Sequence, residues 1–323
     1  MAGSSRNLGI TMGDPAGVGP EITCRALASM PAHERATVRI FGSRRHLEEA
    51  NRVCATSLSF EGAGEGVQIV DVPSKGIDQV RPCVASAGGG EAAYAYVAAA
   101  VDAALRGDIG VIVTAPLNKS ALHAAGREFS GHTELLAHLT ASPRSFMLLA
   151  SEKLSTIHVS THVSLADAVR RATPERVLAT IRAGHAHYIR MGIARPRIAV
   201  AGLNPHCGEG GLFGNEEATQ VAPAIDQART EGMDVHGPIP GDSVFYRATR
   251  GEFDLVVAQY HDQGHIPTKL IAFETTVNVT LGLPIDRTSV DHGTAFDIAW
   301  RGIARHENML AAIAYARRIA GDH

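Results

Sequence analysis

The sequence predicts an α/β protein with about two domains. Short apolar runs such as LGITM, VIVTAP and RIAVAG alternate along the chain with helix-forming segments, and this alternation is typical of a mainly parallel sheet covered by helices. Polar residues follow several of these runs in turns rich in glycine and proline. Reactive groups of α/β proteins lie in such positions, just past the carboxyl ends of strands.

The first predicted strand, residues 8–12, leads into the sequence GDPAGVGPE. Pro20 at the first helical position, followed by Glu21, is a normal helix start. The glycines allow backbone amides to approach an anion or cofactor closely. The pattern is not the dinucleotide motif GxGxxG, so a tight structural turn explains it equally well.

The remaining elements are predicted from apolar runs and helix signals. Asp242 is expected in a turn, and residues 261–276 are expected to form a polar connection between two strands. Gly88–Gly90 are expected to precede a helix. The other predicted strands are residues 36–42, 66–72, 111–116, 146–151, 155–159, 197–201, 256–260 and 277–281, and the other predicted helices are residues 46–54, 91–105, 117–122, 132–139, 172–192 and 301–321.

Composition narrows the class of protein. The formal net charge is −3, so we expect neither a nucleic-acid groove nor a basic membrane-binding face. No run of about 18 apolar residues occurs, so no membrane span is expected. Four cysteines without a CxxC pair and no secretory signal fit free thiols in the cytoplasm.

Polar chemistry is concentrated in Tyr260–Ala299, and three histidines stand out in the chain. His162, His206 and His261 each follow a predicted strand. Three neutral imidazoles from separate loops would form a catalytic divalent-metal site with a position open to substrate. Asp242 and Asp262 are alternative oxygen ligands, with a structural turn as the other explanation for Asp242. No two of the three histidines are spaced i, i+4, so spacing alone does not establish the site.

The motifs GITMGDPAGVGPE, TAPLNK, GHTE, GLNPHCGEGG, YHDQG and NVTLGLPIDRTSVDHGTA together resemble the 4-hydroxythreonine-4-phosphate dehydrogenase (PdxA-like) family over nearly the full chain. The resemblance implies an isocitrate/isopropylmalate dehydrogenase-like fold, with two α/β domains and an active-site cleft between them. It also implies a homodimer with shared active sites. We expect residues 1–125 with 275–323 to form the cofactor-side domain, and residues 126–274 to form the metal, substrate and dimerisation domain.

Residue roles follow from the resemblance. It implies NAD as cofactor and a divalent metal (Zn, Mg, Mn or Co), with His261 supplied across the dimer to the ligand set. The catalytic candidates are Lys269, Asp242 and Asp262, with the proton acceptor left open. The implied metal ligands are His162, His206 and His261; the substrate-binding residues are His132, Thr133, Lys269, Asn278 and Arg287; and the cofactor-binding candidates are His292, Gly293 and Ala295.

The resemblance also suggests a substrate class. The synthase of the vitamin B6 pathway usually has GLP after YHDQ, whereas this chain has GHIPTKLIAF from Gly264 to Phe273. That segment is more similar to a sister branch that oxidises and decarboxylates D-threonate or D-erythronate 4-phosphate in sugar-acid catabolism. The alternative is 4-phosphohydroxy-L-threonine. More remote alternatives are a cis-dihydrodiol dehydrogenase, a phosphate acyltransferase of related architecture and a non-catalytic binding protein.

Overall fold

The computed structural model describes residues 7–60 and 66–321, which divide into two compact units. Unit 1 comprises residues 1–145 and 283–323, and unit 2 comprises residues 146–282. These boundaries differ from the expected divisions after residues 125 and 274. The segment carrying His132 and Thr133 lies in unit 1 because α6 packs against α4. Phe129, just before α6, contacts Tyr94 of α4 with nearly parallel rings at a centroid distance of 6.4 Å.

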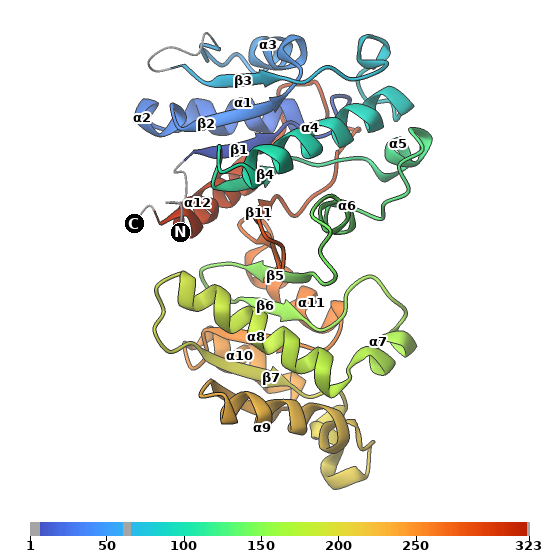
Figure 1. Cartoon of the computed structure of the whole chain (residues 1–323), viewed down its shortest axis with the longest axis vertical. Coiled ribbons are helices and arrows are strands. Elements are labelled where there is room, and N and C mark those ends of the chain that lie inside the picture. Colours follow the sequence, from blue (N-terminus) through green and yellow to red (C-terminus); the bar gives the residue numbers. More distant parts are fainter. Residues whose placement is uncertain (1–6, 61–65, 322–323) are drawn as a thin grey trace. The chain divides into compact units, whose positions relative to one another are not determined.

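Unit 1 contains a parallel sheet in the order β3-β2-β1-β4-β11 (Figure 1). Helix α4 covers β1, β2 and β4, whereas α12 packs on β4 and β11 together with α1. Its elements are β1 (Leu8–Thr11), α1 (Gly19–Ser29), α2 (Ala32–Arg35), β2 (Val38–Gly42), α3 (Arg44–Val53), β3 (Gln68–Asp71), η1 (Ile77–Gln79), α4 (Ala87–Leu105), β4 (Val111–Thr114), α5 (Lys119–Ala124), α6 (His132–Leu139), β11 (Asp286–Ser289) and α12 (Glu307–Ala320).

Strand order in unit 1 reverses between β1 and β4, since β2 and β3 extend the sheet on one side of β1 and β4 lies on the other. Ligands of open α/β sheets bind at such a switch point. The glycine-rich turn after β1 lies here, and Gly13 has a left-handed φ of 74°. A Cβ at Gly13 would lie 2.2 Å from the carbonyl oxygen of Pro116, which follows β4. Glycine is therefore required for the two loops to meet.

Unit 2 contains a mixed sheet in the order β10-β5-β6-β9-β7-β8, in which β6, β9, β7 and β8 are parallel and β5 is antiparallel to both its neighbours. Its elements are β5 (Phe146–Ala150), β6 (Thr156–His158), α7 (Leu165–Arg171), α8 (Pro174–Arg190), β7 (Arg197–Ala201), η2 (Pro205–Gly211), η3 (Glu217–Val221), α9 (Ala222–Thr230), β8 (Asp234–Ile239), α10 (Gly241–Thr249), β9 (Leu255–Ala258), α11 (His261–Ala272) and β10 (Val277–Leu281).

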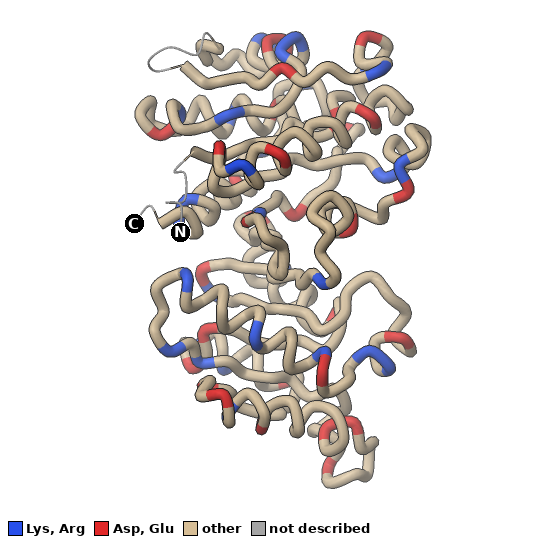
Figure 2. Tube along the Cα trace, viewed as in Figure 1, with Lys and Arg blue, Asp and Glu red and all other residues tan. Residues whose placement is uncertain are grey.

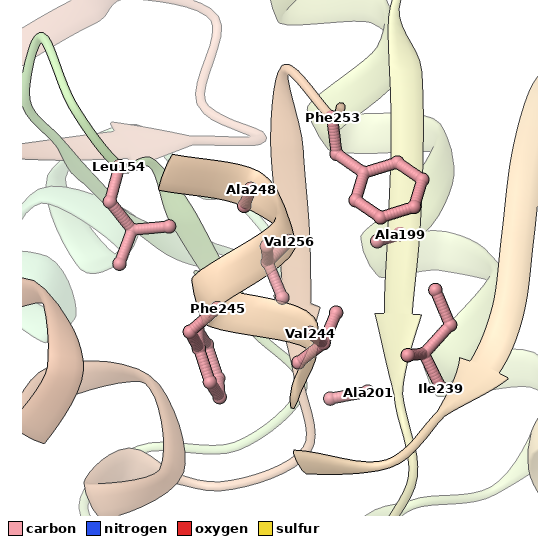
Figure 3. Close-up of a cluster of buried hydrophobic side chains, with 9 residues drawn as sticks. All are labelled: Leu154, Ala199, Ala201, Ile239, Val244, Phe245, Ala248, Phe253 and Val256. Carbon is pink, nitrogen blue, oxygen red and sulfur yellow. The ribbon is translucent and has the colours of Figure 1, made fainter. Parts of the chain in front are cut away.

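Helices cover both faces of the unit 2 sheet. Leu255 of β9 faces α8, because a Cβ at Gly184 of that helix would lie 2.4 Å from the side chain of Leu255. The next residue, Val256, faces α10 and belongs to a buried apolar cluster (Figure 3). The cluster comprises Leu154, Ala199, Ala201, Ile239, Val244, Phe245, Ala248, Phe253 and Val256. Because successive strand side chains point to opposite faces, this core holds α10 against β7 and β9.

Three local predictions were wrong. Asp242 lies in the first turn of α10 rather than in a free turn. Residues 261–272 form α11, with Pro267 inside it, where a polar connection was expected. Gly88–Gly90 lie within α4, because Ser86 caps that helix by accepting a hydrogen bond from the amide of Gly89 at 3.1 Å. Close packing explains one of these glycines, since a Cβ at Gly90 would lie 2.0 Å from the carbonyl oxygen of Ala121.

Charged residues of both signs are intermixed along the described chain of each unit (Figure 2). None of the helices in the described part has both the length and the hydropathy needed to cross a lipid bilayer.

Candidate active site

The three histidines expected to bind metal follow three neighbouring strands of unit 2. His162 lies beyond β6, His261 begins α11 just after β9, and His206 lies beyond β7. These strands are adjacent and parallel, in the order β6-β9-β7. Carboxyl ends of parallel strands meet at the same edge of a sheet, so the fold directs the three loops to one edge.

Two of these histidines lie close together. The ring centroids of His162 and His261 are 5.9 Å apart. Nδ1 of His261 lies 2.6 Å from Oδ1 of Asp262. When this nitrogen donates its hydrogen to the carboxylate, the lone pair of His261 is on Nε2, as in carboxylate–histidine–metal arrangements. A cavity of about 500 Å³ lies here, lined by Thr161, His162, Val163, Ser164, Leu165, Ala168, Tyr260, His261 and Asp262.

His206 lies in a loop with an unusual backbone. His206 to Gly210 have φ between 45° and 79°, and a left-handed conformation costs a non-glycine residue about 1–2 kcal/mol. The buried carboxylate of Glu217 holds the start of the loop by accepting hydrogen bonds from the amides of Leu203 at 2.7 Å and Asn204 at 2.6 Å. Strained segments that surrounding contacts enforce occur often at functional sites.

A second cavity, of about 610 Å³, borders this loop. His206 and Asp242 line it, and so do Tyr260 and Asp262, which also line the cavity beside His162. Within residues 7–60 and 66–321 of one chain, however, no group of three His, Cys, Asp or Glu side chains is placed to hold a metal ion. The imidazole and carboxylate donors fit a divalent metal chemically.

The three catalytic candidates of unit 2 occupy different positions. Asp262 is exposed and bonded to His261, which favours an orienting role. Asp242 is exposed on α10 and faces the cavity of His206. Lys269 is half-buried on α11, eight residues after His261, which places it about 12 Å farther along the helix axis. Its Nζ lies 5.9 Å from the ring centroid of Phe273.

Two further histidines support this region. His158 and His265 are buried, and the rings of His265 and His261 stack at 3.7 Å. Nδ1 of His158 donates to the carbonyl oxygen of Met147 at 3.2 Å, so its Nε2 accepts from Nδ1 of His265 at 3.1 Å. Burial lowers the pKa of His158 to about 4 and that of His265 to about 2, so both rings are neutral at pH 7.

Sequence reasoning treated His158 as a packing residue and missed His265. The sequence does indicate that His265 lies beside His261, because the two are spaced i, i+4 and such residues are neighbours on a helix. It went unnoticed because residues 261–272 were not expected to be helical. Gly264 also belongs to this arrangement, since a Cβ there would lie 2.3 Å from Nε2 of His158. The helix thus approaches β6 closely enough for the two histidines to bond.

Unit 1 holds a buried cation among the expected substrate residues. Arg287 on β11 is 2% exposed, and its Nε and Nη2 donate to Oγ1 of Thr114 at 3.1 and 2.6 Å. Burial lowers the pKa of Arg287 to about 9, and the charge of Glu134 acts in the opposite direction. The group therefore remains a cation at pH 7. A buried guanidinium with neighbouring polar groups can bind carboxylate or phosphate.

His132, at the start of α6, belongs to the same cluster. Burial, and then the charge of Arg287, lower the pKa of His132 well below its usual value. Its Nε2 is buried and has no hydrogen-bond partner among the described residues. Thr133 is half-buried and makes no side-chain cap for α6. In unit 2, Asn278 on β10 has a buried Oδ1 without a hydrogen-bond partner in the described part of the chain. Such unsatisfied atoms are compatible with ligand contacts.

The three cofactor candidates lie in the segment between β11 and α12. His292 and Gly293 are exposed, and Ala295 is half-buried with a left-handed φ of 42°. A Cβ at Gly293 would meet no atom within 4 Å. This part of the segment is therefore accessible to a ligand.

Comparison with known proteins decides the family. The family model described as "Pyridoxal phosphate biosynthetic protein PdxA" matches residues 34–316. The chain belongs to the PdxA family. The resemblance inferred from the six motifs is thereby confirmed.

Relatives in the PdxA family carry two different names. The chain is 46% identical over 323 residues to a D-threonate 4-phosphate dehydrogenase of Cupriavidus necator, covering 97% of each protein. It is also 46% identical over 320 residues to a 4-hydroxythreonine-4-phosphate dehydrogenase of Beijerinckia indica, covering 97% of this chain and 94% of that protein. Both relatives are named as dehydrogenases, which confirms the predicted enzyme class.

A solved structure agrees with the fold. The crystal structure of a 4-hydroxythreonine-4-phosphate dehydrogenase from Klebsiella pneumoniae matches with a TM-score of 0.87 and 44% identity, covering 97% of this chain and 99% of that one. The predicted α/β fold class is therefore confirmed.

Proposed function

We propose that this PdxA-family protein is a metal- and NAD-dependent dehydrogenase that oxidises and decarboxylates a 4-phosphorylated 3-hydroxy acid. The observation that carries the proposal is the placement of His162, His206 and His261 after three adjacent parallel strands. A relative named D-threonate 4-phosphate dehydrogenase and the segment Gly264–Phe273 favour D-threonate or D-erythronate 4-phosphate. The dehydrogenase names imply a nicotinamide cofactor.

The residues divide the chemistry between them. When bound, the divalent ion would supply Lewis-acid stabilisation of negative charge on a substrate oxygen, and the nicotinamide would accept hydride. Asp262 orients His261 through the 2.6 Å contact with its Nδ1. Arg287 supplies a fixed positive charge for a phosphate or carboxylate group, held by its bonds to Thr114. Lys269, Asp242 and Asp262 are the proton-transfer candidates.

The other substrate contacts are proposed from the family resemblance and from local burial. We assign His132 and Thr133 to the same substrate as Arg287, since His132 and Arg287 interact within unit 1. Lys269 and Asn278 are proposed substrate-binding residues on the family resemblance alone. His292, Gly293 and Ala295 are the proposed contacts to NAD.

We further propose a homodimer in which a second copy completes the metal site. Ile266 and Leu270 on α11 and Phe273 at its C-cap form an apolar stripe, with 62, 85 and 69% of their surfaces exposed. Ile266 and Leu270 also line the cavity that contains His206. An exposed apolar stripe of this kind favours a protein interface, and a partner on it would lie beside that histidine. The proposed location is the cytoplasm, where the four free cysteines would remain reduced.

The substrate is tested by adding metal to the purified protein and measuring NADH formation. D-threonate 4-phosphate, D-erythronate 4-phosphate and 4-phosphohydroxy-L-threonine are compared. Activity with either of the first two supports the proposal. Activity with the last alone favours the alternative, which the Beijerinckia relative's name also supports.

The site and the dimer are tested separately. His206→Ala should lose bound metal and NADH production while keeping the fold, and retention of both would refute the metal assignment. Leu270→Glu should yield monomers in sedimentation and reduce metal content. A Leu270→Glu variant that stays dimeric would exclude this stripe as the interface. Ile189→Glu, which changes an exposed apolar residue on α8 of unit 2, controls for added surface charge.

A further inference from the structure

The segment from Asp291 to Gly302 contains neither strand nor α-helix, and its conformation is not one that its residues prefer. Ala295 and Trp300 have left-handed φ values of 42° and 62°, which is costly for non-glycine residues. Contacts from elsewhere in unit 1 must therefore hold this segment in place. Helix α1 and the glycine-rich turn before it provide them.

Glu21, in the first turn of α1, binds the far end of the segment. It is fully buried, and its two carboxylate oxygens accept hydrogen bonds from two different backbone amides. Oε2 accepts from the amide of Trp300, and Oε1 accepts from that of Gly302 at 2.6 Å. One turn later, Arg25 donates to the carbonyl oxygen of Gly302 at 2.5 Å. Charge-assisted hydrogen bonds of this kind are about twice as strong as neutral ones.

The turn before α1 binds other points of the segment. The amide of Val18 donates to the carbonyl oxygen of Thr294 at 3.0 Å. Nε1 of Trp300 donates to the carbonyl oxygen of Pro15 at 3.1 Å. Gly17 permits this approach, because a Cβ there would lie 2.8 Å from Cβ of Thr294. Hydrogen bonds and close packing thus connect the turn before α1 to the segment Asp291–Gly302, although the two are distant in sequence.

We propose that Glu21 is a positioning residue for the nicotinamide cofactor, acting through the backbone of Thr294–Gly302. This inference depends on the proposed function, in which His292, Gly293 and Ala295 contact NAD. His292 and Gly293 are exposed, but the residues on either side of them are held by hydrogen bonds. The amide of Asp291 donates to Oδ1 of Asn308 at 2.7 Å, and the carbonyl oxygen of Thr294 accepts from the amide of Val18. Glu21 pre-organises the segment and so lowers the ordering cost of cofactor binding.

The test compares Glu21→Gln with the wild-type protein. Glutamine keeps one acceptor and places an NH₂ group against the second amide, so one of the two hydrogen bonds is lost. We expect the Kd for NADH to rise about tenfold, as for loss of one charge-assisted hydrogen bond. The KM for the phosphorylated substrate should change less than about twofold, since the variant leaves Arg287 and Thr114 in place.

Trp300 provides the readout. It is the only tryptophan in the sequence, so energy transfer from its indole to bound NADH measures the Kd directly. Glu48→Gln is the matched control, because Glu48 is exposed on α3 and pairs with Arg44 at 3.7 Å. A folded Glu21→Gln variant with an unchanged Kd for NADH, or with equal increases in Kd and KM, would overturn the proposal.

A second variant covers the case in which Glu21→Gln does not fold. Trp300→Phe removes the bond to Pro15 and keeps the backbone bond to Glu21. Its Kd for NADH, measured by calorimetry, should rise severalfold with an unchanged substrate KM. An unchanged Kd contradicts the positioning role.

Hydrogen exchange separates this inference from the proposed function. The amides of Trp300 and Gly302 should exchange faster in Glu21→Gln than in Glu48→Gln without any ligand. Unchanged exchange would show that Glu21 does not hold the segment. A wild-type protein that binds the phosphorylated substrate but not NADH would instead refute the proposed cofactor, whatever the exchange rates.

Discussion

Replacing Asp14 with asparagine should stabilise unit 1 progressively, relative to the wild-type protein, as pH rises from about 4 to about 8. Asp14 is fully buried in the turn after β1. Oδ1 accepts a hydrogen bond from the amide of Ala16 at 2.9 Å, whereas Oδ2 has no hydrogen-bond partner among the described residues. Burial raises the pKa of Asp14 from 3.8 to about 6, despite the opposing effect of the Ala16 amide. The folded state therefore disfavours the ionised carboxylate.

The sign and size of the effect follow from linkage. Because the pKa of Asp14 is raised in the folded state, its favourable contribution is complete below pH 3.8 and is lost as pH rises through about 6. A shift of about 2 units corresponds to about 3 kcal/mol at about 1.36 kcal/mol per unit. Over the range from pH 4 to 8, the titration should change the difference in unfolding free energy between Asp14→Asn and wild type by about 2 kcal/mol.

Urea denaturation between pH 4 and pH 8 tests this prediction, with Trp300 fluorescence as the probe of unit 1. Asparagine can keep the bond to Ala16 but introduces an NH₂ group without a clear acceptor, which costs about 1–3 kcal/mol at every pH. The informative quantity is therefore the change with pH of the difference between the two proteins. A difference that stays constant across this range would refute a raised pKa for Asp14.

Three further predictions concern other contacts. Thr114→Val removes the hydroxyl that binds Arg287. The KM for substrate should rise about tenfold, and the affinity for NADH should not change. An unchanged KM would exclude Arg287 from the substrate site. Glu217→Gln should weaken metal binding by about tenfold or more in equilibrium dialysis, since Glu217 holds the loop of His206; unchanged affinity would contradict this role. Gly90→Ala should cost about 1–3 kcal/mol by overpacking Ala121, and an unchanged melting temperature in calorimetry would contradict it.

The strands were the most predictable part of the fold. VIVT and LVVA are buried at every position, and such continuous apolar runs are typical of parallel strands covered on both faces. The helix after Thr173 was predictable from its cap, which accepts a hydrogen bond from the amide of Arg176 at 3.3 Å. Strand β8 was missed because its sequence, DVHGPI, contains glycine and proline and lacks an apolar run. Helix α11 was missed because Gly264 and Pro267 disfavour helix in isolation.

The candidate site could be predicted only in part. Each loop carrying His162, His206 or His261 followed a recognisable strand, but the pairing order β6-β9-β7 is set by tertiary structure. The bond between His158 and His265 depends on how closely α11 approaches β6. No local sequence pattern specifies the order of these strands or the distance between α11 and β6. For the same reason, the buried bonds between Arg287 and Thr114 could not be inferred from residues 173 positions apart.

The interruption of unit 1 by unit 2 affects how the chain can fold during synthesis. The first and last strands of unit 2 pair antiparallel, with Phe146 opposite Leu281, so all strands of its sheet are available once residue 282 has been made. Unit 1 still lacks β11, the neighbour of β4, at that moment. We therefore expect the inserted unit to complete its sheet on the ribosome first, while the surrounding unit leaves one side of β4 unpaired until residues 283–323 emerge.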